Sequence, residues 1–273
     1  MAQDQNDVVF NYGDDAIIER IDAALTRAGH DPAHVKADDL YLFDQLHGRQ
    51  LDATREHVAR LAPDLHMHVL DIGSGVGGPA RYIATAIGAR GTGIDLTPQF
   101  VATARELTRR CGLERRVEFV EGNAAQMPFA PETFDAAICL YVGMNIPDKS
   151  AVLAEAFRVL KPGARLLWSQ AVAGEGTPHY PLPWARNPQA SHAGPPDELR
   201  GALTGAGFEI LEWVDETEVL LPTGSAAPPP GADPSVNQLV MGADFVERRN
   251  DFMASLAEGL LRSVVVLARK AGP

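Results

Sequence analysis

The sequence has few cysteines, fewer basic than acidic residues, and no long apolar run. Its two cysteines, Cys111 and Cys139, cannot make a disulfide framework and lie in no metal-binding spacing. The 24 Lys and Arg residues against 36 Asp and Glu give a net charge of −12, which repels phosphate backbones and anionic lipid headgroups. No run of about 18 apolar residues occurs that could cross a bilayer. We therefore expect no nucleic-acid partner and no membrane association.

The start of the chain also lacks a targeting signal. Residues 1–15 are polar and acidic, without the basic start and apolar run of a secretory signal, so we expect a reduced, cytoplasmic protein. No group of His, Cys, Asp or Glu has the spacing of a metal site, and we expect no metal. With 273 residues, 45% of them hydrophobic, the chain has enough apolar side chains for one full core domain plus additions.

Short apolar runs alternate with amphipathic segments from residue 68 onward. The predicted strands are 68–72, 91–95, 117–120, 134–140, 164–169, 208–214 and 263–268. The predicted helices among them are 80–87, 98–111, 150–160, 197–206 and 236–261. Strands that alternate with helices predict a doubly wound α/β fold, in which a mostly parallel sheet carries helices on both faces.

Both ends of the chain depart from this alternation. Residues 1–62 are expected to form an N-terminal helical cap plus the first helix of the fold, ahead of a main domain over 63–273. Within that domain, residues 171–196 are rich in Pro and Gly and predict an active-site loop. Residues 222–261 predict a Pro/Gly-rich linker and an inserted helix, which packing explains better than a binding surface; a substrate lid and a homodimer surface remain alternatives.

A glycine-rich turn follows the strand over residues 68–72. Gly73, Gly75 and Gly78 let a ligand approach the backbone, and the next helix offers free N–H groups. Asp95, about 20 residues further on, suits ribose hydroxyls, and the pattern alone fits a nicotinamide dinucleotide. Asp71, however, places a carboxylate where a pyrophosphate would lie. It repels a pyrophosphate and attracts a cationic sulfonium cofactor that carries an ammonium group.

Six sequence blocks in this order and spacing resemble the class I S-adenosylmethionine-dependent methyltransferases. The blocks are 69–78, 93–96, 121–124, 127–129, 134–135 and 158–163. Within that family the chain is similar to the small-molecule branch, which includes glycine/sarcosine, tocopherol-type and natural-product tailoring enzymes. The resemblance covers residues 40–215 well. It implies a Rossmann-like sheet of seven strands with the last one antiparallel, and methyl transfer from S-adenosylmethionine to an O, N or C atom of a small molecule.

The resemblance also implies cofactor contacts residue by residue. Asp71, Gly73 and Gly75 match the block around the methionine portion of the cofactor. Asp95 matches the acid that binds both ribose hydroxyls, and Leu96 matches the residue that packs on the adenine.

Three further positions complete this implied cofactor site. Asn123 stands where the family usually has Asp, and its side-chain oxygen is expected to accept the adenine N6 hydrogens. Ala124 is expected to offer its backbone N–H to the ring. Leu140 matches the position whose carbonyl faces the cofactor ammonium.

The acceptor should bind where the strands end at their carboxyl edge. Met144, Tyr180 and Trp184 are candidates for the pocket wall, although the two aromatic residues could instead anchor the loop.

Four residues are candidates for catalysis: His47, Tyr141, Asn145 and His192. His47 is the leading base because an imidazole works near neutral pH, yet a lone histidine is more often structural. Asn145 could orient the substrate.

Two other classes of protein remain open at this point. A nicotinamide-dependent oxidoreductase would need a positive pyrophosphate site, which Asp71 opposes. A non-catalytic cofactor-binding or interaction protein would keep the cofactor residues but lack a closed substrate pocket.

Overall fold

The computed structural model describes residues 16–221, 235–242 and 244–272, and its centre is a seven-stranded sheet of order β3-β2-β1-β4-β5-β7-β6. The strands are β1 (His68–Ile72), β2 (Arg90–Asp95), β3 (Val117–Glu121), β4 (Phe134–Leu140), β5 (Leu160–Ala173), β6 (Phe208–Asp215) and β7 (Leu261–Lys270). β7 runs antiparallel to β5 and β6, and the other paired strands are parallel. The predicted mostly parallel sheet with an antiparallel last strand is confirmed.

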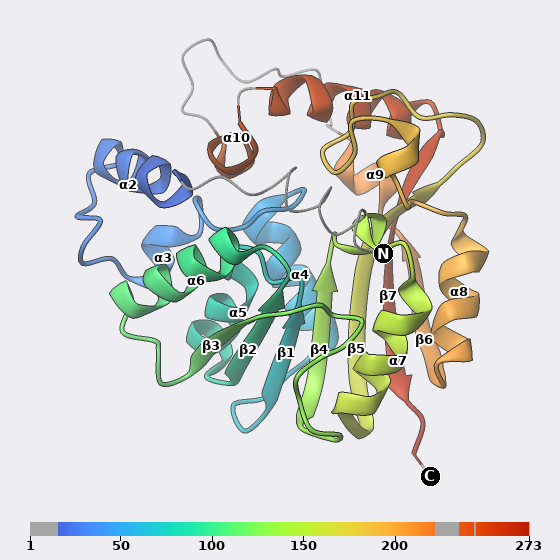
Figure 1. Cartoon of the computed structure of the whole chain (residues 1–273), viewed down its shortest axis with the longest axis horizontal. Coiled ribbons are helices and arrows are strands. Elements are labelled where there is room, and N and C mark those ends of the chain that lie inside the picture. Colours follow the sequence, from blue (N-terminus) through green and yellow to red (C-terminus); the bar gives the residue numbers. More distant parts are fainter. Residues whose placement is uncertain (1–15, 222–234, 243, 273) are drawn as a thin grey trace.

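Helices cover both faces of this sheet and one of its ends. They are α2 (Ile17–Arg27), α3 (Ala37–Leu40), α4 (Gln50–Leu61), α5 (Gly78–Tyr82), α6 (Pro98–Arg110), α7 (Lys149–Val159), α8 (Pro196–Gly205), α9 (Thr217–Leu220), α10 (Val236–Met241) and α11 (Phe245–Ala257). A π-helical turn, Ile83–Ile87, extends α5, and short 3₁₀ turns occur at Gly143–Asn145 (η2) and Pro188–Ala190 (η3). Figure 1 shows α9, α10 and α11 together at the end of the sheet where β1 and β4 finish.

The two faces of the sheet bury alternate residues of the same strands, as the two-residue period of a strand requires. Leu70 and Ile72 of β1 pack in one apolar cluster with residues of α7 and α8. Val69, between them, packs on the other side with Val58 of α4 and Ile83 of the π-helical turn. These strands are covered on both faces, so they appear in the sequence as short continuous apolar runs.

Two predictions about the second half of the chain are wrong in detail. The helix expected over 236–261 is two helices, because Gly242, at φ 93°, ends α10 in a conformation that a helix cannot contain. The strand expected over 164–169 extends from Leu160 to Ala173, with a register shift opposite Phe134–Ala136 that accommodates the Pro162-Gly163 pair. The loop predicted to begin at residue 171 therefore begins after β5.

The N-terminal helical cap packs onto the main fold. Ile17, Ile21 and Leu25 of α2 share an apolar cluster with Leu107 of α6 and Val240 of α10. The division at residues 62 and 63 stays a prediction. The predicted linker over 222–234 lies outside the described residues. Among the described helices, none combines the length and the apolar character that a bilayer span requires.

Candidate functional site

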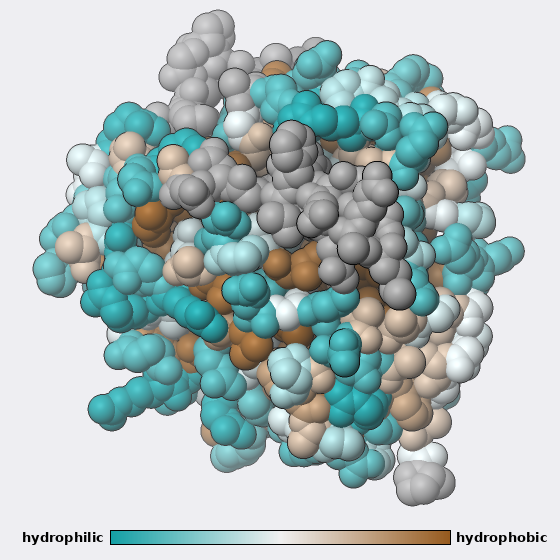
Figure 2. All heavy atoms as spheres, in the orientation of Figure 1, coloured by the Kyte–Doolittle hydropathy of each residue, from teal (hydrophilic) through white to brown (hydrophobic). Residues whose placement is uncertain are grey.

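A cavity of about 660 Å³ lies where the parallel strands end at their carboxyl edge. All eight residues expected to bind the cofactor line it: Asp71, Gly73, Gly75, Asp95, Leu96, Asn123, Ala124 and Leu140. They come from the ends of β1, β2, β3 and β4 or from the turns that follow. Figure 2 shows hydrophobic residues in the middle of this face of the molecule and hydrophilic residues around them. The topology thus brings together residues that lie up to about 70 positions apart in the sequence.

The glycine turn after β1 leaves room for a ligand only because it lacks side chains. Gly73 has φ 72°, and a Cβ there would lie 2.4 Å from Cγ2 of Val142. Gly75, also left-handed at φ 52°, donates its N–H to the Asp95 carboxylate over 2.8 Å. Backbone rather than side chains therefore forms this edge of the cavity.

Asp71 is a buried carboxylate with an open position. Its side chain is 2% exposed, and Oδ2 has no hydrogen-bond partner. Burial, and then the charge of Asp95, raise the pKa of Asp71 to about 7. Oγ of the neighbouring Ser74 is likewise buried without a partner. A cofactor that brings a cationic group to this position fits, because it would satisfy the carboxylate and stabilise its charged form.

Asp95 is held in a fixed orientation by the backbone. Its Oδ2 accepts from Gly75, and its Oδ1 accepts from the N–H of Thr97 over 2.9 Å. Burial raises the pKa of Asp95, although these N–H donors act in the opposite direction. Each carboxylate oxygen keeps a further lone pair, so two vicinal hydroxyls of a ribose could still donate to it.

Asn123 is less free than the sequence suggested. Its Oδ1 accepts from the backbone N–H of Ala125 over 2.8 Å, which forms a local turn. One lone pair of that oxygen remains for an adenine amine. Leu96, half-buried, lines the same part of the cavity.

His47 lines the cavity but is poorly suited to remove a proton. Its Nε2 lies 2.9 Å from Oγ1 of Thr54, and its Nδ1 lies 3.1 Å from the carbonyl oxygen of Gly48. Burial lowers the pKa of His47 to about 4. An imidazole with both nitrogens engaged and so low a pKa is a weak base at neutral pH, and these contacts favour a positioning role.

Tyr141, directly after β4, forms a wall beside His47. The two rings stack with centroids 5.7 Å apart. Tyr141 has φ 57°, an uncommon conformation for a residue with a side chain, and its hydroxyl lies 3.5 Å from Oγ of Ser263. Burial raises the pKa of Tyr141 to about 12, so the phenol stays protonated at neutral pH. Met144 and Asn145 of η2 continue this wall.

Trp184 lies in the cavity wall, whereas Tyr180 and His192 are not among the residues that line it. Trp184 packs edge-on against Phe252 of α11, with ring centroids 5.3 Å apart. Tyr180 packs beside an apolar cluster that includes Trp184. The backbone of His192 donates to Met144 over 2.9 Å and accepts from Nζ of Lys149 over 2.7 Å, which holds the loop against η2.

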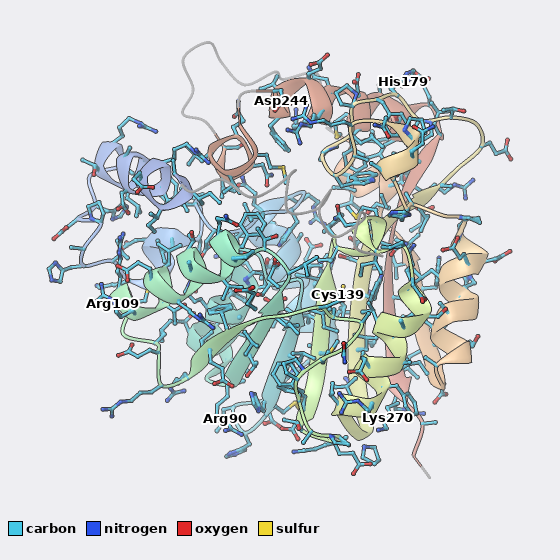
Figure 3. All side chains as sticks on the ribbon, in the orientation of Figure 1. Arg90, Arg109, Cys139, His179, Asp244 and Lys270 are labelled. Atoms are coloured by element: carbon cyan, nitrogen blue, oxygen red, sulfur yellow. The ribbon has the colours of Figure 1, made fainter. Side chains whose placement is uncertain are left out.

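The loop after β5 and the helix α11 are joined into one cover over the cavity. The Asp244 carboxylate lies 2.8 Å from Arg186 of the loop and 2.8 Å from Arg248 of α11. His179 of the loop pairs with Glu258 at 2.9 Å. Figure 3 shows His179 and Asp244 at the same end of the molecule, opposite Arg90 and Lys270. We call residues 174–195 together with α10 and α11 the lid.

The lid supplies cavity residues that the sequence analysis explained as packing. Met241, Phe245, Phe252 and Met253 line the cavity, as does Arg249. The signal was present, because positions 245, 249, 252 and 253 share one face of a helix. An apolar stripe along a helix does not by itself indicate whether the stripe packs on a core or lines a cavity. Among the described residues, no three His, Cys, Asp or Glu side chains gather into an arrangement that could hold a metal ion.

Comparison with known proteins finds a family match in the central segment of the chain. A family model described as a methyltransferase domain matches residues 70–168. Residues 70–168 are thus similar to a methyltransferase domain. The matched segment begins in β1 and ends in β5, so it contains the glycine turn, Asp95 and Asn123.

Several curated methyltransferases are similar to this domain. The methyltransferase phqN of Penicillium fellutanum is 44% identical over 104 residues, which are 38% of this chain and 32% of that protein. The methyltransferase GfsG of Streptomyces halstedii is 32% identical over 186 residues, 64% of this chain and 65% of that protein. The chain thus spans about a third to two thirds of the length of these relatives.

Solved structures share the whole architecture. A geranyl diphosphate C-methyltransferase from Streptomyces coelicolor A3(2), in complex with Mg²⁺, geranyl-S-thiolodiphosphate and S-adenosyl-L-homocysteine, has a TM-score of 0.72 at 18% identity, over 98% of each chain. The [4+2]-cyclase SpnF has a TM-score of 0.62 at 23% identity, over 93% of this chain and 94% of that one. These likenesses establish the methyltransferase fold of the chain.

Proposed function

We propose that this protein transfers a methyl group from S-adenosylmethionine to an O, N or C nucleophile of a small molecule. The observation that carries the proposal is the Asp71 carboxylate, buried and open at Oδ2 beside a left-handed glycine turn within a methyltransferase domain. S-adenosylmethionine supplies an electrophilic methyl group on a cationic sulfur.

The chain's own residues have three tasks in this proposal. Asp71 and Asp95 bind the cationic and the ribose portions of the cofactor at two adjacent strand ends. The stacked rings of His47 and Tyr141 position the acceptor, and the lid, through Trp184, excludes water. Methyl transfer is an in-line displacement, which requires the nucleophile to lie about 3 Å from the methyl carbon in a site that excludes water. An acceptor with a low pKa of its own needs no base from the protein.

The other expectations about the protein remain proposals. The low cysteine content and the acidic charge support a cytoplasmic enzyme without a nucleic-acid or membrane partner. We also propose that the reaction needs no metal, since no His, Cys, Asp or Glu residues of the sequence have the spacing of a metal site. A homodimer stays a prediction from the sequence.

One relative in structure favours a second candidate function. The cyclase SpnF shares this fold over nearly the whole chain, so the same scaffold can serve a reaction other than methyl transfer. A nicotinamide-dependent reaction is less well supported, because Asp71 repels a pyrophosphate at the glycine turn.

Calorimetric titration with S-adenosylhomocysteine, and separately with NADH, tests the cofactor assignment. We expect micromolar binding of S-adenosylhomocysteine and none of NADH. Asp95→Ala should abolish the binding, whereas Glu114→Gln, which changes an exposed acid outside the cavity, should leave it unchanged. Near-normal affinity in the Asp95 variant would overturn the ribose assignment. Binding of S-adenosylhomocysteine without methyl transfer to any of a panel of acceptors would favour the second candidate function.

A further inference from the structure

The acceptor end of the cavity combines apolar side chains of η2, the loop and the lid helices with an exposed arginine, Arg249. We propose that the acceptor is an apolar molecule that carries an acidic group, with its body against η2 and α11 and its acidic group at Arg249. This inference rests on the proposed function and specifies its substrate class.

The apolar wall consists of side chains from four segments of the chain. Met144 of η2 and Trp184 of the loop are 5% and 4% exposed, and Phe252 of α11 packs edge-on against Trp184. Met241 and Met253 add two flexible thioethers on the lid side. Methionine side chains adapt to irregular apolar shapes, so this wall suits a bulky hydrocarbon body better than a small polar amine or amino acid.

Arg249 lies on the same face of α11 as this wall. It follows Phe245 by four positions and precedes Met253 by four, so one side of the helix presents all three to the cavity. Arg249 is exposed, and it makes no ion pair with any residue in the described part of the chain. The adjacent Arg248, in contrast, is 1% exposed and paired with Asp244. Arg249 therefore remains available to a ligand.

The acids around the cavity have other partners or lie at the cofactor end. Asp44 pairs with Arg81 at 3.0 Å, and Asp148 accepts from the N–H of Ala151 as the N-cap of α7. Asp71 and Asp95 belong to the cofactor site. Among the acids of the described cavity lining, none forms an ion pair with Arg249.

An anionic group on the acceptor would complete this arrangement. A chain of net charge −12 repels anions in general, so an acidic ligand needs a local cation, and a guanidinium binds carboxylate, sulfonate or phosphate oxygens through two hydrogen bonds. In a cavity with apolar walls, such a charge-assisted pair is worth more than at an open surface.

Two fluorescent probes of similar apolar body separate the two parts of this proposal. 8-Anilinonaphthalene-1-sulfonate carries an anion, and N-phenyl-1-naphthylamine is neutral. Both are titrated into the full chain saturated with S-adenosylhomocysteine, for the wild type, Arg249→Gln, Phe252→Ala and the control Arg262→Gln. Arg262 is an exposed arginine of β7 outside the cavity.

We expect Arg249→Gln to lower the affinity for the anionic probe about fivefold or more, and the affinity for the neutral probe less than about twofold. Phe252→Ala should lower the affinity for both probes, and the control Arg262→Gln should change neither affinity. The proposal that the acceptor carries an acidic group would be contradicted by either of two results. One is unchanged affinity of Arg249→Gln for the anionic probe, and the other is an equal loss of affinity for both probes. Unchanged affinity of Phe252→Ala for both probes would contradict the proposal that the acceptor's apolar body binds against this wall. Calorimetry with S-adenosylhomocysteine on the same samples distinguishes these results from failure of the cofactor assignment.

Discussion

In the proposed function, Asp71 links cofactor binding to protonation. Burial, and then the charge of Asp95, raise its pKa to about 7, so its protonation changes in the neutral pH range. A cationic group at Oδ2 favours the ionised form, so binding releases the proton. The residue is thus at once a recognition element and a pH-sensitive one.

We therefore expect the affinity for S-adenosylhomocysteine to fall by up to about tenfold for each pH unit below 7, and to level off above pH 8. Calorimetric titration between pH 5.5 and 8.5, in two buffers of different ionisation enthalpy, measures both the affinity and the proton release. Asp71→Asn should bind more weakly and lose most of this pH dependence. A wild-type affinity that does not change with pH would contradict the assigned pKa.

His47 offers a second test at the level of one residue. The pKa of His47 is about 4, and both of its ring nitrogens have partners. We therefore expect that His47→Gln removes no limb near pH 6.5 from the pH profile of turnover. The variant should lower turnover less than about tenfold, with the affinity for S-adenosylhomocysteine kept. Loss of a limb in the pH profile together with a loss of turnover above about 100-fold would restore His47 as the general base.

At the residue scale, all the residues expected to bind the cofactor line the cavity, whereas two of those expected on the acceptor side do not. Asp71, Gly73 and Asp95 follow directly from strand ends and a glycine turn, so local pattern sufficed to place them. Tyr180 and His192 depend on how a loop of more than 20 residues folds back, which no local pattern specifies, and neither reaches the cavity.

At the scale of elements, ion pairs that the sequence alone does not reveal join the two parts of the lid. Asp244 contacts Arg186, 58 positions away, as well as Arg248 on its own helix. Both arginines lower the pKa of Asp244, the contact with Arg248 most. The Arg248 side chain is buried, so removing Asp244 would remove an ion pair from a place that water screens little.

We expect Asp244→Ala to loosen the lid without unfolding the sheet. Amide hydrogen exchange should become faster in α11 and around residues 183–186, while β1 and β4 stay protected, and the affinity for S-adenosylhomocysteine should change less than about threefold. Glu247→Ala, which changes an exposed acid of the same helix, is the matched control. Equal exchange in the two variants would show that the ion pairs at Asp244 do not hold the lid.

The elements themselves were largely predictable, except where a backbone conformation decided between alternatives. Short runs rich in apolar residues predicted the strands of the sheet, most clearly β1 and β4, which are buried on both faces. The division between α10 and α11 depends on the left-handed Gly242, and a glycine within a helical pattern is often tolerated. The extension of β5 through Pro162 depends on its pairing with β4, which is a contact between distant segments.

At the scale of the whole molecule, buried acids near the cavity set the pH dependence of stability. Burial raises the pKa of Asp44, Asp71 and Asp95 in the folded chain. The folded state therefore holds their protons more tightly than the unfolded state does, and their contribution to stability is lost as pH rises toward about 7 for Asp71. Acids with lowered pKa, such as Glu216, act oppositely and lose their contribution as pH falls below the usual carboxyl range.

The protein should accordingly be most stable near about pH 4.5, with a Tm that declines as the pH rises to about 7 and then levels off. S-adenosylhomocysteine at a fixed concentration should raise the Tm more at pH 8 than at pH 6, because it binds the ionised form of Asp71. Thermal unfolding followed by circular dichroism across this range measures both effects. Asp71→Asn should flatten the decline, and a Tm that rises steadily from pH 5 to 8 would contradict the role of the buried acids.

The position of the lid in the chain has a consequence for how such proteins diverge. The lid helices α10 and α11 lie between β6 and β7, which are hydrogen-bonded antiparallel neighbours from Phe208–Lys270 to Asp215–Val264. A tight hairpin turn could join two such strands, so the segment 216–260 is a cassette that the sheet does not need for its connectivity. Exchange of this cassette between two enzymes of the same fold should carry acceptor preference with it and leave the cofactor half of the protein unaltered.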